Sequence, residues 1–592
     1  MGEFVQGIPA SPGIVIGPAC VVRWPGLDVP HATVTPDRVE IEIQRFYVAR
    51  EEAIQRTGEL RVRAEGRLGA VQAKIFDPQL MMLEDPDLIE GTITYISESF
   101  LTAERAFTLR VLEFRSQWLD ATHARVMDRV ADLSDIQARV LSRLINLPEK
   151  DVLQGSTTDP VILVARELTP SHMVELDVDR VLGVATDAGT RTAHASILAR
   201  SLRIPAVVGL GNLSLRVENG VELVLDGKRG RVVISPTESE KHKFQDREVK
   251  AKETARDLAH IAGQEARTKD GTRIGIYANL ELPADAEAAV ALNVDGVGLF
   301  RTEFLVVGKA AAPDEEEQYE AFRSVVEVLS PRPVAIRIFD LGGDKFPLFL
   351  PPIVEENPFL GWRGMRIYDL MPELFQSQVR AIYRAAAHGP VRMLVPMVNS
   401  VEEIRAVRAV MEKARAELSS QGVDHGEVLL GAMLETPASI GIAEMLGRHV
   451  DYFSIGTNDL IQYMLAVDRG NAQLAAYFDL YHPALLRYIR EAVEAAERVA
   501  VPICVCGEAA SDPLGATLLI GLGVRSLSCT PSAILEQKKL VRLLDLGTLI
   551  PFVEELMKAE TGAEIRERLL VALSAGIDLP SLDSSPSLSR PD

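Results

Sequence analysis

Eight short apolar segments recur in the second half of the chain, and this rhythm restricts the possible folds more than any other feature. The segments begin near residue 274 and end near residue 529, and the stretches between them are long enough for a helix. Strands alternating with helices predict either a closed (β/α)8 barrel or an open, doubly wound sheet. Eight units in about 260 residues favour the barrel. The segments are IGIYANL, GVGLF, VAIRIF, RMLVPMV, LLGAML, YFSIG, ICVC and SLSC.

Polar residues follow these segments at the points where the predicted strands end. Both candidate folds bind ligands at the carboxyl ends of their strands, so this pattern predicts a site at that end. The residues that mark it are Arg301, Asp340, Glu435, Asn458, Asp459 and Glu508.

The pattern of apolar residues changes twice in the first half of the chain. Short strand-like segments at the start return after residue 161, and a helical periodicity separates them. We therefore expect a multidomain α/β protein in which a helical bundle is inserted into one α/β domain. The expected parts are an α/β domain from residues 1–35 and 148–236, the bundle at 36–147, a linker helix at 237–266, a (β/α)8 barrel at 267–575 and a disordered tail at 576–592.

Composition excludes several classes of protein. The formal net charge of −21 argues against nucleic-acid binding, which needs basic patches. The start of the chain lacks a signal sequence, and no apolar run is long enough to span a membrane. Four cysteines are too few for a disulfide framework in a chain of 592 residues. These features together predict a cytoplasmic protein.

His194 is the strongest candidate for a catalytic residue in the first half. It lies in the segment 187–209, which runs from a strand through a glycine turn into a helix expected to begin near Ala195. Thr192 is a candidate cap, Arg191 adds a cation, and a helix N-terminus suits an anion such as phosphohistidine. Neutral imidazole is a good phosphoryl acceptor near pH 7. A histidine used only for packing is the alternative.

The histidine segment resembles the phosphohistidine loop of the phosphoenolpyruvate–protein phosphotransferases, which are Enzyme I of the sugar phosphotransferase system. It is more distantly similar to that of pyruvate phosphate dikinase. The resemblance extends over about residues 5–575. Thr190, Ala193 and Ala195 depart from the family pattern around the histidine. The other motifs are GVGLFRTEFL, IRIFDLGGDK, ENPFLGWRGMRI, MLETPAS, FSIGTNDLIQYMLAVDRGN and CGEAA.

The resemblance implies a role for each matching residue in the barrel. Guanidinium groups grip the carboxylate and phosphate of phosphoenolpyruvate, and carboxylates hold Mg2+. Asn458 would hydrogen-bond the substrate, and the Cys506 thiol would protonate enolpyruvate. The substrate arginines implied are Arg301, Arg337 and Arg469, with Arg363 as a plausible fourth, and the implied Mg2+ ligands are Glu435 and Asp459.

Structural alternatives exist for these residues. Each arginine could form a surface salt bridge, and Glu435 and Asp459 could cap the helices that follow them. Cys504 and Cys506 stand two apart on one strand, where a metal or redox pair is the competing interpretation.

The implied function is the transfer of a phosphoryl group from phosphoenolpyruvate to His194, and then to a histidine of the phosphocarrier protein HPr, with release of pyruvate. The α/β domain would swivel on hinges near Pro236 and Gly263, and the helical insertion would bind HPr. Acidic residues such as Asp77, Glu84 and Asp85 could meet a basic face of HPr, and an ordinary solvated helix surface is the alternative for each of them. The family also implies a homodimer formed through the barrel. A regulatory, nitrogen-type phosphorelay enzyme and a dikinase-like enzyme are the alternatives; the chain shows neither an N-terminal sensory segment nor a glycine-rich nucleotide loop.

Overall fold

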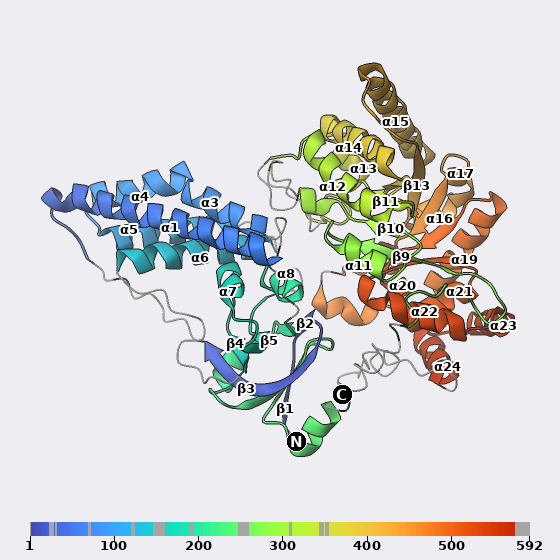
Figure 1. The fold of residues 1–592 in the computed structure, drawn as a ribbon, viewed down its shortest axis with the longest axis horizontal. Coiled ribbons are helices and arrows are strands. Elements are labelled where there is room, and N and C mark those ends of the chain that lie inside the picture. Colours follow the sequence, from blue (N-terminus) through green and yellow to red (C-terminus); the bar gives the residue numbers. More distant parts are fainter. Residues whose placement is uncertain are drawn as a thin grey trace. The chain divides into compact units, whose positions relative to one another are not determined.

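The chain divides into two compact units, residues 1–252 and residues 253–592 (Figure 1). The structure is a computed structural model. The residues it describes are 2–22, 29, 32–68, 73–119, 125–145, 160–189, 194–202, 204–244, 246, 258, 260–306, 311–342, 349, 355–469 and 471–574.

The first unit contains an eight-stranded mixed sheet in the order β1-β8-β7-β3-β4-β5-β6-β2. Strand β3 runs parallel to β4, with Ala19 opposite Ile162. N-terminal strands and strands after residue 160 therefore share one sheet, which confirms that the helices between them are an insertion. The strands are β1 (Glu3–Gln6), β2 (Ile8–Ser11), β3 (Ile14–Val22), β4 (Val161–Ala165), β5 (Val181–Thr186), β6 (Ala206–Val208), β7 (Glu222–Asp226) and β8 (Arg231–Ile234).

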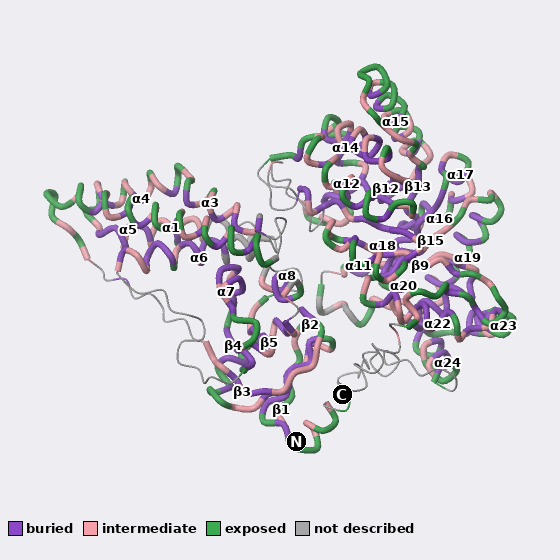
Figure 2. The backbone as a smooth tube through the Cα atoms, viewed as in Figure 1, coloured by how far each residue is buried: buried purple, intermediate pink, exposed green. Residues whose placement is uncertain are grey.

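Buried and exposed residues alternate along the inserted helices (Figure 2). The helices pack around their own apolar core, whose largest buried side chains include Phe46 and Phe107. The Asp85–Pro86 pair begins one of these helices, because Asp85 caps it by accepting from the Asp87 N–H at 2.8 Å. The helices are α1 (Val39–Leu68), α3 (Asp77–Leu83), α4 (Pro86–Ser99), α5 (Ala103–Leu119) and α6 (Arg125–Leu144).

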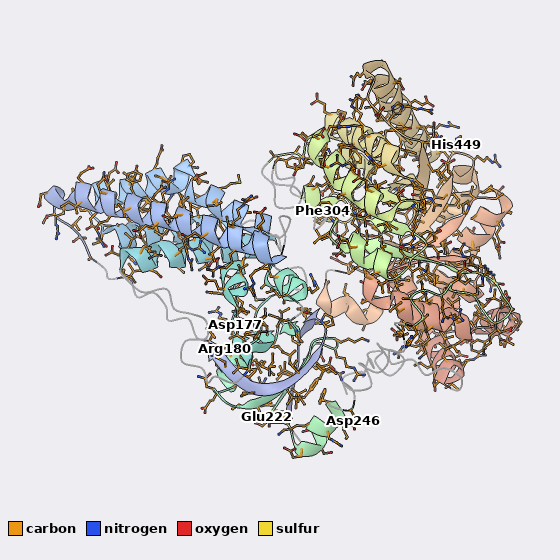
Figure 3. All side chains as sticks on the ribbon, viewed as in Figure 1. Asp177, Arg180, Glu222, Asp246, Phe304 and His449 are labelled. Atoms are coloured by element: carbon orange, nitrogen blue, oxygen red, sulfur yellow. The ribbon has the colours of Figure 1, made fainter. Side chains whose placement is uncertain are left out.

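A buried polar network joins the helices to the sheet part of the first unit. Arg139 of α6 donates to the Ser171 hydroxyl at 2.7 Å, and this hydroxyl donates to Asp135 at 2.6 Å. Ser171 belongs to a short helix that follows β4. The short helices of this part are α7 (Pro170–Glu175), α8 (His194–Ser201) and α9 (Leu213–Arg216). Arg180 and Asp177, labelled in Figure 3, form the turn between α7 and β5 through a backbone hydrogen bond of 3.1 Å.

The second unit is a closed barrel of eight parallel strands, because β9 pairs with both β10 and β16. This closure decides between the two folds that the sequence allowed. All eight predicted segments form strands: β9 (Gly275–Leu280), β10 (Val297–Phe300), β11 (Val334–Arg337), β12 (Val391–Val395), β13 (Val428–Leu434), β14 (Tyr452–Ile455), β15 (Ile503–Val505) and β16 (Ser526–Cys529).

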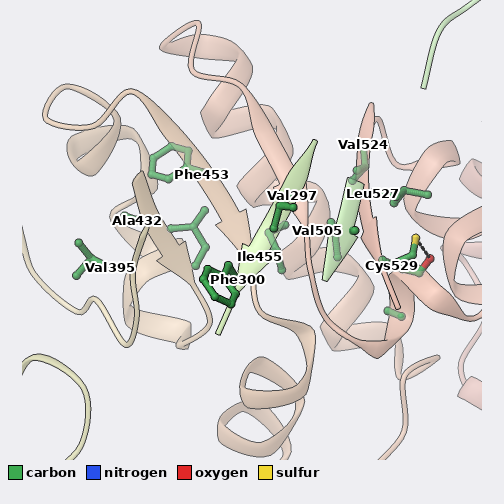
Figure 4. Packing of buried hydrophobic residues seen from close by; sticks show 14 of the residues in the cluster. Val297, Phe300, Val395, Ala432, Phe453, Ile455, Val505, Val524, Leu527 and Cys529 are labelled. Atoms are coloured by element: carbon green, nitrogen blue, oxygen red, sulfur yellow. Dashed lines mark hydrogen bonds between the residues drawn. The ribbon is translucent and has the colours of Figure 1, made fainter. Parts of the chain in front are cut away.

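Helices surround the barrel and bury its outer face. Phe300, Phe453 and Val505 lie in the cluster between strands and helices shown in Figure 4. The helices are α11 (Asp285–Ala291), α12 (Glu315–Leu329), α13 (Met365–Tyr368), α14 (Pro372–Ala385), α15 (Val401–Gln421), α16 (Pro437–Gly441), α17 (Ala443–Gly447), α18 (Thr457–Leu465), α19 (Pro483–Arg498), α20 (Glu508–Ser511), α21 (Pro513–Gly521), α22 (Ile534–Leu543), α23 (Leu546–Leu556) and α24 (Gly562–Ser574).

Two expected segments fall largely outside the described residues. In the segment 237–266, the backbone is helical over 238–244, while residues 247–257 are not described. The expected tail, 576–592, also lies outside the described part. Among the described helices, none combines the length and apolarity needed to cross a membrane.

Candidate active site

His194 is the first residue of α8, one residue before the expected helix start. Its side chain and residues 190–193, which include Thr190, Arg191, Thr192 and Ala193, lie outside the described residues. The helix behind His194 is anchored, because Leu198 and Ala199 are buried and Ala195 packs against the same core.

The strand end before His194 is also firmly held. Asp187, which follows β5, accepts a hydrogen bond from the Ser214 N–H at 2.9 Å. The Thr186 hydroxyl donates to the Ala188 carbonyl at 2.7 Å. Gly189 has a φ of +116°, a conformation that side-chain-bearing residues rarely adopt. The loop that carries His194 therefore leaves the sheet from a fixed position.

Arg337 lies at the end of β11 and is only 4% exposed. It donates to Glu303 at 2.7 Å and lies 3.2 Å from Asp340. The Thr302 hydroxyl donates to the Arg337 carbonyl at 2.8 Å, which also fixes the backbone of this strand end. A buried guanidinium held by two carboxylates is not a surface salt bridge, so that alternative is wrong for Arg337.

Arg363 is equally buried and reaches the same cluster from the loop before α13. Its Nε and Nη2 donate to the two oxygens of Asp340 at 3.0 and 2.9 Å, in the bidentate geometry that guanidinium favours. Its Nη1 donates to Asp459 at 2.7 Å and to the Tyr463 hydroxyl at 2.9 Å. The neighbouring carboxylates keep the pKa of Arg363 well above its usual value, although burial opposes them.

Three further predicted residues, Arg469, Arg301 and Asn458, lie in the segments that follow other strands of the barrel. Arg469 follows α18 and lies 3.5 Å from Asp459. Arg301, after β10, is partly exposed and donates to Glu281 at 2.6 Å. The Asn458 side-chain oxygen accepts from the Glu508 N–H at 3.2 Å, which links the ends of β14 and β15.

Glu435, which follows β13, has a buried carboxylate oxygen without a hydrogen-bond partner among the described residues. Its Oε1 accepts from the Met397 N–H at 2.6 Å, but its Oε2 has no hydrogen-bond partner among the described residues. Burial, followed by the charges of Asp459 and Asp340, raises the pKa of Glu435 to about 8, although Arg337 and Arg363 oppose the shift. A cation would relieve this excess of negative charge.

The carboxylates of this cluster fit a hard divalent cation that shares its ligands with a substrate. Within the described part of the chain, no three His, Cys, Asp or Glu residues are arranged to hold a metal by themselves. Mg2+ commonly takes one or two carboxylates and completes its shell with substrate oxygens and water. The unpartnered Glu435 oxygen beside Asp459 matches that pattern.

The capping alternative for the two carboxylates is wrong. Thr436 caps α16 through its hydroxyl. Helix α18 has Gly456 at its N-cap and no side-chain cap. Gly456 is also required sterically, because a Cβ there would lie 2.3 Å from Glu435 Oε2. Asp459 instead contacts Arg363 and Arg469, and Glu435 lies near enough to Arg337 and Arg363 for their charges to lower its pKa against the effect of burial.

Cys506 follows β15 and is 3% exposed inside the barrel. Its thiol donates to the Ile455 carbonyl at 3.5 Å. Burial raises the pKa of Cys506 to about 11, with Ser454 opposing the shift. The group is thus a thiol at neutral pH and can donate a proton. All four cysteines are free, which leaves the disulfide version of the Cys504–Cys506 pair without support.

Three residues of the cluster escaped prediction from the sequence. Glu303 holds Arg337, Glu281 holds Arg301, and Tyr463 contacts Arg363. Glu303 stands two residues after Arg301 in the same motif, and Tyr463 lies in the motif that contains Asp459. Their place in those motifs was the only available signal, because each partner is distant in sequence.

Comparison with known proteins covers both units. Three family models match, described as "PEP-utilising enzyme, N-terminal" over residues 6–129, "PEP-utilising enzyme, mobile domain" over 157–230 and "PEP-utilising enzyme, PEP-binding domain" over 255–546. A phosphoenolpyruvate-protein phosphotransferase of Haemophilus influenzae is 36% identical over 95% of this chain and 98% of its own length. The chain belongs to the phosphoenolpyruvate–protein phosphotransferase family.

Other members of the phosphoenolpyruvate–protein phosphotransferase family are similar to the same extent. Proteins of that name from Staphylococcus carnosus and Priestia megaterium are each 34% identical, over 95% and 96% of this chain and 98% of their own lengths. The similarity thus extends over the sheet, the inserted helices and the barrel, and the family resemblance inferred from the motifs is confirmed.

Proposed function

We propose that this protein transfers the phosphoryl group of phosphoenolpyruvate to His194, and from phospho-His194 to a histidine of an HPr-like phosphocarrier protein, with release of pyruvate. One observation carries the proposal. In a chain of this family, the barrel gathers the buried guanidinium groups of Arg337 and Arg363 with the carboxylates of Asp340, Glu435 and Asp459 at the ends of its strands.

The arginines are suited to an anion with two charged groups. Arg301, Arg337, Arg363 and Arg469 would grip the carboxylate and phosphate of phosphoenolpyruvate, with Asn458 as a further polar contact. Each of these arginines already has an acidic partner in the protein: Glu281, Glu303, Asp340 or Asp459. These partners fix the side chains before the substrate arrives, which reduces the cost of ordering them.

Glu435 and Asp459 would hold Mg2+, with the unpartnered Glu435 oxygen as the observation in favour. When bound, the ion would neutralise charge on the substrate oxygens as the phosphoryl group leaves.

In the first step, a ring nitrogen of His194 forms a bond to phosphorus while the bond between phosphorus and the enol oxygen breaks. The electron pair of that bond stays with the oxygen of enolpyruvate. The Cys506 thiol then gives its proton to the methylene carbon, which yields pyruvate, and the thiolate regains a proton from solvent. The pKa of about 11 supports this role because it keeps the proton on sulfur until a carbon base is in place.

The second step requires His194 to leave the barrel and meet the carrier. We propose that hinges near Pro236 and Gly263 allow this, that the insertion at 36–147 binds the carrier, and that the barrel forms a homodimer. Of the acidic residues suggested for the docking face, Asp77 is paired with Arg61 at 2.7 Å and Asp85 caps α4. These two side chains are partly engaged within the bundle.

Labelling with 32P-phosphoenolpyruvate and Mg2+ tests the central step. Wild type should acquire acid-labile label, and His194→Ala should not. His242→Ala, at an exposed position in the same unit, is the matched control and should label like wild type. Label that persists in His194→Ala would refute the assignment. Label acquired from ATP in place of phosphoenolpyruvate would favour the dikinase-like alternative.

A further inference from the structure

The ring of Phe359, an uncharged side chain, contacts the guanidinium groups of two of the arginines. The Cζ atom of Arg363 is 5.8 Å from the ring centroid, and the Cζ atom of Arg469 is 5.6 Å from it. Both distances are within the range at which the negative face of an aromatic ring attracts a cation. One ring therefore contacts two guanidinium groups that repel each other.

The loop that carries Phe359 is built to hold the ring in place. The Tyr463 hydroxyl donates to the Phe359 carbonyl at 2.6 Å and accepts from Arg363 at 2.9 Å. The Trp362 N–H donates to Glu355 at 2.7 Å. Gly364 ends the loop with a φ of +58° and contacts Met397 where a Cβ would stand. These contacts fix the backbone of the loop, and the Tyr463 hydroxyl ties the backbone of Phe359 to Arg363.

Asp459 also contacts both arginines, but it is at the same time a proposed ligand of Mg2+. Arg363 lies 2.7 Å and Arg469 3.5 Å from its two oxygens. A cation bound to Asp459 would weaken both ion pairs at the moment when the arginines must meet the substrate. Among the described residues, Asp459 and Phe359 are the two partners of the Arg469 side chain, so the ring would be the contact that remains.

We propose that Phe359 is a positioning residue that holds Arg363 and Arg469 side by side for the anionic groups of phosphoenolpyruvate. This inference rests on the proposed function, because it assumes that these two arginines bind the substrate. The ring compensates the repulsion between the guanidinium groups without adding a negative charge that would compete with the substrate. A carboxylate in its place would repel the substrate instead.

The test is a series of variants at Phe359 that either remove the ring or change the charge on its face while keeping its shape. Phe359→Leu should raise the KM for phosphoenolpyruvate between about 2-fold and 30-fold, and kcat should change less, because the ring acts on binding. Phe359→Tyr keeps the aromatic ring, so its KM should stay close to that of wild type. Phenylalanines with one, two and three ring fluorines should raise KM stepwise, because fluorine withdraws charge from the ring face.

Leu360→Ala is the matched control, since Leu360 is the next residue of the loop and is 64% exposed. It should leave KM and kcat unchanged. A KM that stays flat across the fluorinated series would overturn the inference, because a ring that only fills space is insensitive to fluorination. The proposed function fails in a different way: wild type would then show no label from phosphoenolpyruvate.

Discussion

Asp340 is the residue on which the arginine cluster depends. It is 2% exposed, and its carboxylate accepts two hydrogen bonds from Arg363 while lying 3.2 Å from Arg337. Two guanidinium groups can stay buried only if carboxylates such as that of Asp340 balance their positive charge. Asp340 thus stabilises the fold and sets the geometry of the site at once.

Replacing Asp340 by Asn should therefore destabilise the barrel unit. The variant keeps the shape but leaves two buried cations short of charge, and such a change typically costs about 3–5 kcal/mol of unfolding free energy. Denaturant unfolding measures it. Glu281→Gln is the control: Glu281 also pairs with an arginine, but it is exposed, so the loss should stay below about 1 kcal/mol. Equal losses in both variants would contradict this view of Asp340.

The Cys506 thiol should react with alkylating agents more slowly than an exposed cysteine. Burial raises its pKa to about 11, so little thiolate exists at pH 7 to 8, and the rate should climb as pH approaches 11. Mass spectrometry of iodoacetamide adducts between pH 7 and 10 measures the rate at this one position. A rate that reaches a plateau below pH 9 would exclude the raised pKa.

Removing the Cys506 thiol should separate the two halves of the reaction. Cys506→Ala keeps the arginines and His194, so labelling from phosphoenolpyruvate should survive. Pyruvate release in a coupled assay should fall by about 10²-fold or more, the usual worth of a positioned acid. Undiminished pyruvate formation would remove Cys506 from the mechanism.

At the scale of elements, His172 lies at the join between the inserted helices and the sheet. It belongs to the capping box of α7, where its Nδ1 accepts from the Thr169 N–H at 3.2 Å. Burial lowers its pKa; nearby Arg139 acts in the same direction, and Asp135 opposes it. The folded protein therefore binds a proton at this site less readily than the unfolded chain does.

This difference predicts a loss of stability in mild acid. Above the ordinary value of 6.5, neither state is protonated, and the contribution of His172 is complete. As pH falls from 6.5 to the lower folded pKa, only the unfolded chain gains a proton, so stability drops by at most about 1.4 kcal/mol per pH unit. Melting of the first unit between pH 7.5 and 5 measures the slope. His172→Gln should flatten it and His242→Gln should not; identical slopes in the two variants would refute the prediction.

The elements themselves were predictable because they depend on local pattern. Eight apolar runs, followed by Arg301, Glu435 and their counterparts, sufficed for the barrel and the end at which its site lies. Which acid holds which arginine was not predictable, because Glu303 and Arg337 are separated by 34 positions in sequence. The contacts of Phe359 could not be predicted for a related reason: an apolar residue in a loop carries no sequence signal for the cations that contact it in the folded protein.

At the scale of the whole molecule, the two units should respond differently to substrate. In His194→Ala, which under the proposed function cannot accept the phosphoryl group, phosphoenolpyruvate with Mg2+ should slow hydrogen exchange in barrel peptides. At a ligand concentration 100 times Kd, the stabilisation is about 2.7 kcal/mol. Peptides containing 355–364 and 434–437 should be protected most, and peptides from 160–189 should not change. Protection confined to the first unit would contradict a substrate site in the barrel.

The closing strand pairs of each unit also order the assembly of the chain during its synthesis. The inserted helices are contiguous in sequence and need nothing downstream to form their core, whereas β1 must wait for its partner β8, which ends at Ile234. The barrel cannot close until β16, ending at Cys529, reaches β9. At about 5–20 residues per second, the first sheet is complete on the order of 15 to 60 s before the barrel can close. The nascent chain would carry the first unit, already folded, while the barrel is still unfinished.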